Sequence, residues 1–154
     1  MCIVSKFSSV LPITIFDRPQ GSDELWQDFD LGPGIFHIRE GYEIQIRIQN
    51  INDATLLTLV NEVSGVPELA FLNLSENRNI TDSGLQHLKE LKQLKGLNLS
   101  SCSITSSGMD ALSVLSNLEH LNLSYCNRIN DTGLRALKPL RNLTYLDLQG
   151  CIKT

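Results

Sequence analysis

A six-residue leucine motif recurs along most of this 154-residue chain and restricts the folds that the chain can adopt. The motif, L-x-x-L-x-L, begins at intervals of 25, 24 and 25 residues, at Leu69, Leu94, Leu118 and Leu143. Leucine accounts for 26 residues, and 23 of them follow residue 50. A fixed period of this length is typical of repeat architectures, in which each repeat is one small structural unit. The larger part of the chain is therefore predicted to be a stack of similar units.

Further positions recur with the same period after each motif. One fixed position holds Asn77, Cys102, Cys126 and Cys151. The first three copies continue with NITDSGL, SITSSGM and RINDTGL, and then with apolar residues three apart. The L-x-L alternation predicts a short strand with its leucines on one face, and the three-residue spacing predicts a short helix. The residues suited to cap the first and third helices are Thr81 or Asp82, and Asn130 or Asp131. Pro139 is expected to keep the third helix short.

One strand and one short helix cannot bury their own apolar faces, but stacked copies can share a core. The predicted fold class is therefore α/β, with a curved parallel sheet on the concave side of a solenoid and short helices on its convex side. A degenerate earlier copy is visible in IQIRIQNINDATLLTLV, where the isoleucines alternate from Ile44 to Ile48 and leave the strand register open. The repeats are assigned to residues 44–154.

These motifs resemble leucine-rich repeats of the cysteine-containing type, in which a cysteine takes the fixed position and I-T-D-x-G-L opens the helix. The resemblance implies the solenoid fold described above. It also implies one specific role, because similar arrays serve as substrate receptors in ubiquitin ligases, where a separate F-box recruits the ligase. Two positions depart from the pattern: Asn77 replaces the first cysteine, and Ser106 replaces an aspartate, which is expected to weaken the second helix cap slightly.

Residues 1–43 differ in composition and are predicted to form a folded cap on the first repeat. They contain six of the nine aromatic residues and carry three basic against seven acidic side chains, which is the whole net charge of −4. The segments GIFHI and YEIQIRI flank Arg39, Glu40 and Gly41 and predict a β-hairpin. The segment shows no three-helix F-box pattern, so a ligase role would need a further domain or another partner.

The last strand is predicted to lie at an open edge, because no helix-forming segment follows it. Leu143, Leu146 and Leu148 are expected to be only half buried there, and Cys151 to be open to oxidation. We expect this edge to be covered by self-association as a homo-oligomer, or to belong to a longer array.

The outward positions of the strands form rows across the expected sheet and include aromatic and amide side chains. Such a face suits protein or peptide binding, since rings supply contact area and amides supply hydrogen bonds. The alternative is a solvated face whose asparagines only form a polar ladder. The candidate partner-binding residues are Phe71, Asn73, Asn98, His120, Asn122, Tyr125, Tyr145 and Asp147.

Several other function classes are not favoured by the sequence. Serine, histidine and aspartate fall in different rows and repeats, which does not suit a hydrolase triad. The cysteines follow the repeat period and lack paired C-x-x-C spacing, so they are expected to be core residues and not metal ligands. No nucleotide-binding loop is present, and an acidic chain does not suit nucleic acid. We expect no catalytic residue, no cofactor, no metal and no membrane partner.

The sequence therefore predicts a non-enzymatic module that binds a partner protein or peptide on its concave sheet. Cysteines at a structural period and the lack of a secretory signal pattern favour a reduced, cytoplasmic location. Two alternatives stay open: a substrate-recognition subunit of a ubiquitin ligase, and a structural segment of a larger repeat array.

Overall fold

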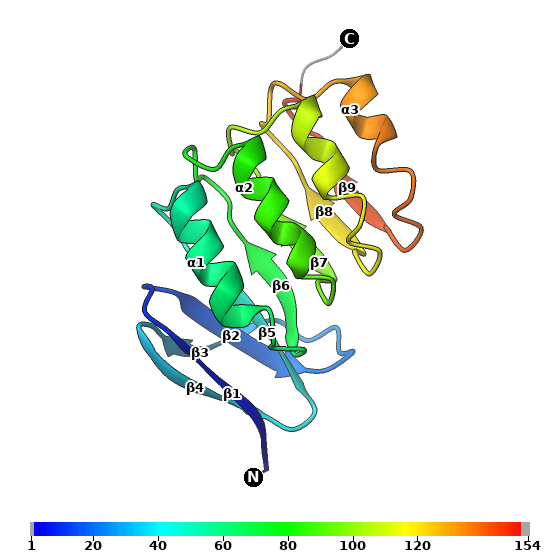
Figure 1. Ribbon diagram of the computed structural model, residues 1–154. Coiled ribbons are helices and arrows are strands. Elements are labelled where there is room, and N and C mark those ends of the chain that lie inside the picture. Colours follow the sequence, from blue (N-terminus) through cyan, green and yellow to red (C-terminus); the bar gives the residue numbers. More distant parts are fainter. Residues whose placement is uncertain (1, 152–154) are drawn as a thin grey trace.

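Short strands and short helices alternate along most of the chain in the computed structural model, which describes residues 2–151 (Figure 1). The strands are β1 (Ile3–Ser9), β2 (Thr14–Pro19), β3 (Gln27–Leu31), β4 (Gly34–Arg39), β5 (Tyr42–Arg47), β6 (Leu69–Asn73), β7 (Gly96–Asn98), β8 (His120–Asn122) and β9 (Tyr145–Asp147). The α-helices are α1 (Asp53–Val63), α2 (Asp82–His87) and α3 (Asp131–Arg135), and the 3-10 helices are η1 (Leu88–Glu90) and η2 (Ser106–Ala111).

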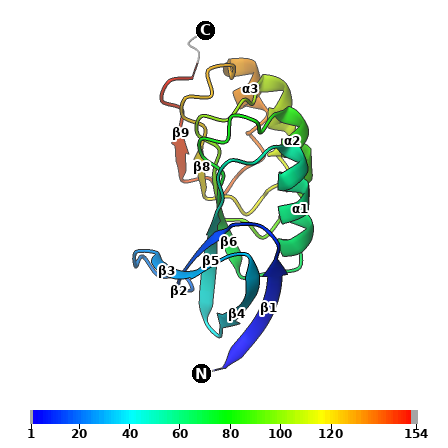
Figure 2. The same cartoon turned by 90° about the vertical axis from the view of Figure 1, so that its left-hand side faces the viewer.

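The strands form one seven-stranded sheet, in the order β3-β2-β5-β6-β7-β8-β9, and one two-stranded ribbon, β1-β4. From β5 to β9 all neighbours are parallel, whereas β2 pairs antiparallel with both β3 and β5. The helices cover one face of the sheet, and the opposite face is left open (Figure 2). The β2–β3 hairpin projects on the side of the open face.

The repeats stack in register, as the leucine period predicted. Leu72, Leu97 and Leu121 occupy equivalent positions in neighbouring strands and are buried. The leucines that open and close each of the first three motifs are fully buried as well. The predicted fold class is confirmed: a parallel sheet, short helices on the other side and one shared apolar core.

A ladder of side-chain hydrogen bonds runs along the fixed position of the repeats. The thiols of Cys102, Cys126 and Cys151 each donate to a backbone carbonyl of the preceding repeat at 3.2 Å. Asn77 does more at the first position: its Nδ2 donates to the carbonyls of Ile48 and Leu74, both at 2.9 Å, and its Oδ1 accepts from the amide of Ile51 at 3.1 Å. The asparagine therefore links the first repeat to the turn after β5.

A second ladder joins the starts of successive helices. Asp53 accepts hydrogen bonds from the amide and hydroxyl of Thr81, and Asp82 accepts the same pair from Thr105. The hydroxyl of Ser106 takes this place in the next repeat, where it accepts the amide of Asn130 and donates to its Oδ1. Thr105 still caps the Ser107 amide at 3.2 Å. Ser106, which stands where the pattern has aspartate, therefore changes the link to the next repeat. The cap of η2, which Thr105 provides, stays in place.

The N-terminal β cap is present, but the hairpin predicted around Glu40 is wrong. Strand β4 pairs with β1, whereas β5 pairs with β2 and β6. The physical reason is burial, because Phe36 and Ile38 of β4 and Ile44 and Ile46 of β5 all lie in the core. A two-layer arrangement lets the apolar faces of both strands pack on one core, whereas a single flat hairpin would place them side by side.

The cap is attached to the repeats through both of its layers. Strand β5 contains the boundary predicted between residues 43 and 44, so cap and repeats share one sheet. The β1–β4 ribbon is held to the helix side, where Ser9 Oγ donates to Glu62 Oε2 at 2.5 Å and Ser5 Oγ donates to Glu68 Oε2 at 2.9 Å. Residues 3–47 thus supply five strands.

The opposite end of the solenoid leaves part of the core at the surface. Leu146 in β9 is 39% exposed, and Leu143 and Leu148 are half buried, as predicted. Residues 152–154, which were expected to follow this strand without a helix, lie outside the described part of the chain. No helix within residues 2–151 is long and apolar enough to cross a bilayer.

Candidate functional site on the concave sheet

Four aromatic side chains form a continuous row across the open face of the sheet, which we call the aromatic row: Trp26, Phe71, His120 and Tyr145. The ring centroids lie 5.2 Å apart for Trp26 and Phe71, 5.8 Å for Phe71 and His120, and 6.0 Å for His120 and Tyr145. Strands β6, β8 and β9 supply three members at equivalent register positions. Tyr145 is 50% exposed, and His120 is exposed as well.

The fourth ring comes from the cap. Trp26 lies just before β3, in the projecting hairpin, and its ring contacts Phe71 edge to face. The guanidinium of Arg18 in β2 lies over both rings, 4.2 Å from the Trp26 centroid and 5.2 Å from that of Phe71. Cation–π contacts of this kind hold an arginine against rings without removing their outer faces from solvent. The cap therefore extends the aromatic row beyond the repeats.

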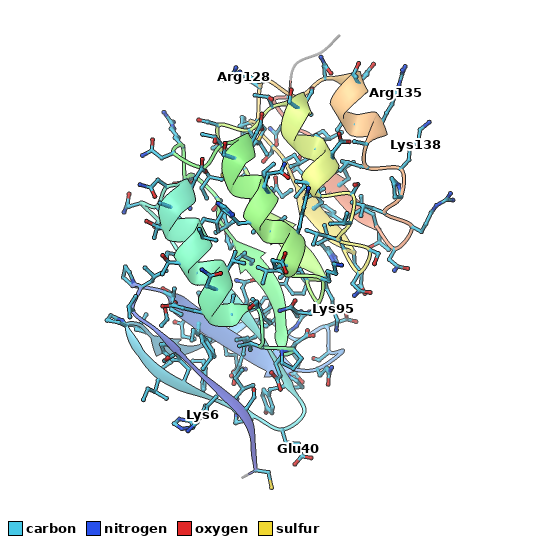
Figure 3. The ribbon with its side chains drawn as sticks, in the orientation of Figure 1. Lys6, Glu40, Lys95, Arg128, Arg135 and Lys138 are labelled. Carbon is cyan, nitrogen blue, oxygen red and sulfur yellow. The ribbon has the colours of Figure 1, made fainter. Side chains whose placement is uncertain are left out.

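A buried carboxylate fixes this arginine in place. Glu43 in β5 is paired with Arg18 Nε at 2.8 Å and with Lys95 Nζ at 3.1 Å, and its side chain is only 3% exposed. Arg18 and Lys95 are partly exposed, so the two cations reach the surface on either side of Glu43. They line a cleft of about 340 Å³ together with Phe71 and His120. Figure 3 labels Lys95 on the cap-proximal part of the repeats.

The asparagines of the open face lie in register, and each one stabilises the turn after its strand. Asn73, Asn98 and Asn122 accept, through Oδ1, the backbone amide two residues further on, at 2.9–3.0 Å. Asp147 makes the same bond to the Gln149 amide at 2.9 Å. Each of these side chains therefore closes the turn that ends its strand. The polar ladder considered as an alternative is present, and in the described part of the chain the three Nδ2 groups make no hydrogen bond.

A groove lies between the aromatic row and the asparagines of the open face. It has a volume of about 210 Å³, and its lining includes Phe71, Asn98, His120, Asn122 and Tyr145. Seven of the eight residues predicted from the sequence thus lie together on this face: Phe71, Asn73, Asn98, His120, Asn122, Tyr145 and Asp147.

Tyr125 is the predicted site residue that lies apart from this group. It follows β8 in a turn with φ of 60°, and its ring packs over Gly150. It borders a separate hollow of about 420 Å³, together with Arg78 and Arg128. Because the turn leads the chain away from the sheet face, Tyr125 does not join the aromatic row, although it is 55% exposed.

The serine, histidine and aspartate side chains of the sheet do not assemble into a triad. His120 is flanked by Phe71 and Tyr145, and the Ser124 hydroxyl donates to Asn122 at 2.7 Å. Within residues 2–151, no hydrogen bond joins a serine hydroxyl to a histidine ring.

The four cysteines are free thiols. Burial raises the pKa of the Cys102 thiol to about 12 and that of Cys126 to about 11. Both groups are therefore protonated at neutral pH and inert as nucleophiles. Cys151, which is half buried, has its pKa raised by the same cause.

The site also contains four residues that are not among those predicted from the sequence: Trp26, Arg18, Glu43 and Lys95. One signal was available for Glu43, because Ile44 and Ile46 alternate with residues that must face the open side. Trp26 had no comparable signal, since its place depends on how the β2–β3 hairpin projects from the sheet.

One comparison with known families agrees with the observed fold. A family model described as leucine rich repeat matches residues 67–129 and 92–151. Among solved structures, an internalin from Listeria monocytogenes is 19% identical, with a TM-score of 0.43. The match covers 66% of this chain and 38% of the internalin chain. No curated protein matches the chain.

Proposed function

Because this chain belongs to the leucine-rich repeat family, we propose that it is a non-enzymatic module that binds a partner protein or peptide on its open sheet face. Leucine-rich repeat domains generally mediate protein–protein interaction. The observation that carries the proposal here is the aromatic row, a continuous series of four rings on a face that no helix of residues 2–151 covers. Aromatic side chains are enriched at the energetic centres of protein interfaces.

The surroundings of the aromatic row also support binding. Arg18 and Lys95 present charge beside the rings, and the Glu43 carboxylate between them is buried and satisfied by both. Such an arrangement combines an apolar centre with a polar rim, as interfaces usually do. A ligase-receptor role would need a separate recruiting domain or another partner, since residues 3–47 contain five strands and the loops between them.

Capture from a cell lysate by immobilised protein tests this proposal. We expect Phe71→Ala and Tyr145→Ala each to reduce the amount of the main captured protein at least about tenfold, because loss of a central interface ring costs about 2 kcal/mol or more. Arg135→Ala and Lys138→Ala are the controls, because both residues lie in or just after α3, on the helix side of the sheet and away from the aromatic row (Figures 2 and 3). Equal capture by all four variants would contradict the proposal.

A further inference from the structure

The three asparagines of the open face present hydrogen-bond donors without matching acceptors. Their Oδ1 atoms are occupied by backbone amides at 2.9–3.0 Å. In the described part of the chain, their Nδ2 groups make no hydrogen bond. Backbone groups of the inner strands are paired within the sheet and offer nothing further. We call Asn73, Asn98 and Asn122 the amide row.

The amide row ends in opposite charges. Arg47 in β5 is in register with Asn73, and Asp147 in β9 is in register with Asn122. Within residues 2–151 neither Arg47 nor Asp147 takes part in an ion pair. The row therefore runs from a free cation, along three donors, to a carboxylate, with the aromatic row beside it.

This pattern selects the backbone conformation of a ligand. A peptide segment in the groove must accept hydrogen bonds from the amide row through its backbone carbonyls. The groove offers few acceptors for the backbone amides of that segment. A polyproline II helix meets this requirement, because its carbonyls make no internal hydrogen bond and proline has no amide donor. Prolyl rings also suit an aromatic surface, and aromatic-lined grooves are a general means of recognising such helices.

The dimensions fix the length of the segment. From β5 to β9 there are four strand spacings of about 4.8 Å, or roughly 19 Å. A polyproline II helix rises about 3.1 Å per residue, so about six residues reach from Arg47 to Asp147. We propose that the groove binds a proline-rich segment of about six residues that carries an acidic residue at the Arg47 end and a basic residue at the Asp147 end. This inference rests on the proposed function and specifies the partner for the same face.

The test uses labelled synthetic peptides and fluorescence anisotropy with the full chain. The first peptide has four prolines between one glutamate and one lysine, and a second replaces the prolines with glycine and serine. We expect the proline peptide to bind at least about tenfold more tightly, because its backbone is already ordered. Peptides with two glutamates or two lysines at the ends should bind roughly threefold more weakly, since exposed charge pairs contribute modestly.

Two variants connect the binding to the proposed groove. Asn98→Asp keeps the Oδ1 acceptor that closes the turn, as Asp147 does naturally, but removes the Nδ2 donors. It should weaken binding of the proline peptide at least about threefold while the melting temperature stays unchanged. Asp147→Lys should shift the preference to the peptide with two glutamates, because both ends of the row are then cationic.

The outcomes separate this inference from the proposed function. Equal binding of the proline and glycine-serine peptides, or binding that Asn98→Asp and Asp147→Lys both leave unchanged, would overturn the inference. If Phe71→Ala still abolishes capture of a protein from lysate in that case, the proposed function holds and only the proline-rich ligand is rejected. If Phe71→Ala changes neither capture nor peptide binding, both are rejected.

Discussion

The phenyl ring of Phe71 occupies the space that a Cβ atom on Gly96 would need. The two residues are register partners in β6 and β7, so the ring lies across the neighbouring strand. From there it reaches the ring of His120 two strands away from its own. The absence of a side chain at residue 96 is therefore what makes the aromatic row continuous.

Gly96→Ala is expected to push the Phe71 ring away from its site and to interrupt the aromatic row. Overpacking of this kind costs about 1–3 kcal/mol of unfolding free energy. In a Phe71→Ala background the same change should cost less than about 0.5 kcal/mol, because the clash is gone. Denaturant unfolding of the four proteins in this cycle measures both values, and a cost that is equal in both backgrounds would contradict the packing described.

Asn77→Cys tests why the first repeat departs from the cysteine pattern. A thiol can donate only one hydrogen bond, so the Ile51 amide and one carbonyl would lose their partner. Each unsatisfied buried group costs about 1–3 kcal/mol, and we expect a total loss of at least about 2 kcal/mol in unfolding free energy. Cys126→Ser is the matched control, since serine keeps the single donor and should cost less. An equal loss for the two variants would argue against the special role of Asn77.

Asp82→Ala is expected to loosen the stacking of α2 against η2. The carboxylate accepts the Thr105 amide at 2.7 Å and the Thr105 hydroxyl at 2.5 Å. Loss of these charge-assisted bonds should lower the unfolding free energy by about 1.5–3 kcal/mol. Asp110→Ala, at an exposed position of η2, should change it by less than about 0.5 kcal/mol. Thermal or urea unfolding compares the stability lost by the two variants. A larger loss for Asp110→Ala than for Asp82→Ala would contradict the role given to the hydrogen bonds between Asp82 and Thr105.

The buried thiols predict a loss of stability in alkaline solution. In the unfolded chain a thiol ionises near pH 9, whereas burial raises the pKa of Cys102 to about 12 and that of Cys126 to about 11. Between these values the unfolded state binds fewer protons than the folded state, so the unfolding free energy falls as pH rises above about 9. Below pH 9 the thiols contribute no pH dependence.

Serine variants separate this effect from other alkaline titrations. The double variant Cys102→Ser, Cys126→Ser keeps the donors and removes the ionisation, so its stability should fall less than that of the wild type between pH 9 and pH 11. Urea unfolding at a series of pH values gives both slopes. Parallel slopes would mean that the two thiols are not buried as described.

The repeats could be predicted from the sequence because each copy contains apolar residues that only a neighbouring copy can bury. Leu72, Leu97 and Leu121 each need the next repeat to become buried, so the period alone specifies the register. The half-buried leucines of the last strand follow from the same rule applied at an edge. The cap has no repeated pattern of this kind. The sequence around Phe36 and Ile38 fits a flat hairpin as well as a two-layer packing, and only the burial of the apolar faces of both β4 and β5 distinguishes the two arrangements.

The candidate site was predictable to the extent that it lies on the repeats. Register brought together Phe71, His120 and Tyr145, because equivalent positions of stacked strands must be neighbours. Trp26 reaches Phe71 through the projection of a hairpin from the cap, which no local pattern specifies. Tyr125 is predicted to flank the outward residues at the strand ends, but a left-handed turn directs it to a separate hollow.

A partner that binds as proposed covers the aromatic row, and hydroxyl-radical footprinting detects this within one molecule. Tyr145 and Tyr125 are almost equally exposed, at 50% and 55%, but only Tyr145 belongs to the aromatic row. Adding the protein recovered by capture should reduce the oxidation of Tyr145 severalfold and leave that of Tyr125 unchanged. Protection of Tyr125 with Tyr145 still fully oxidised would show that the partner binds elsewhere.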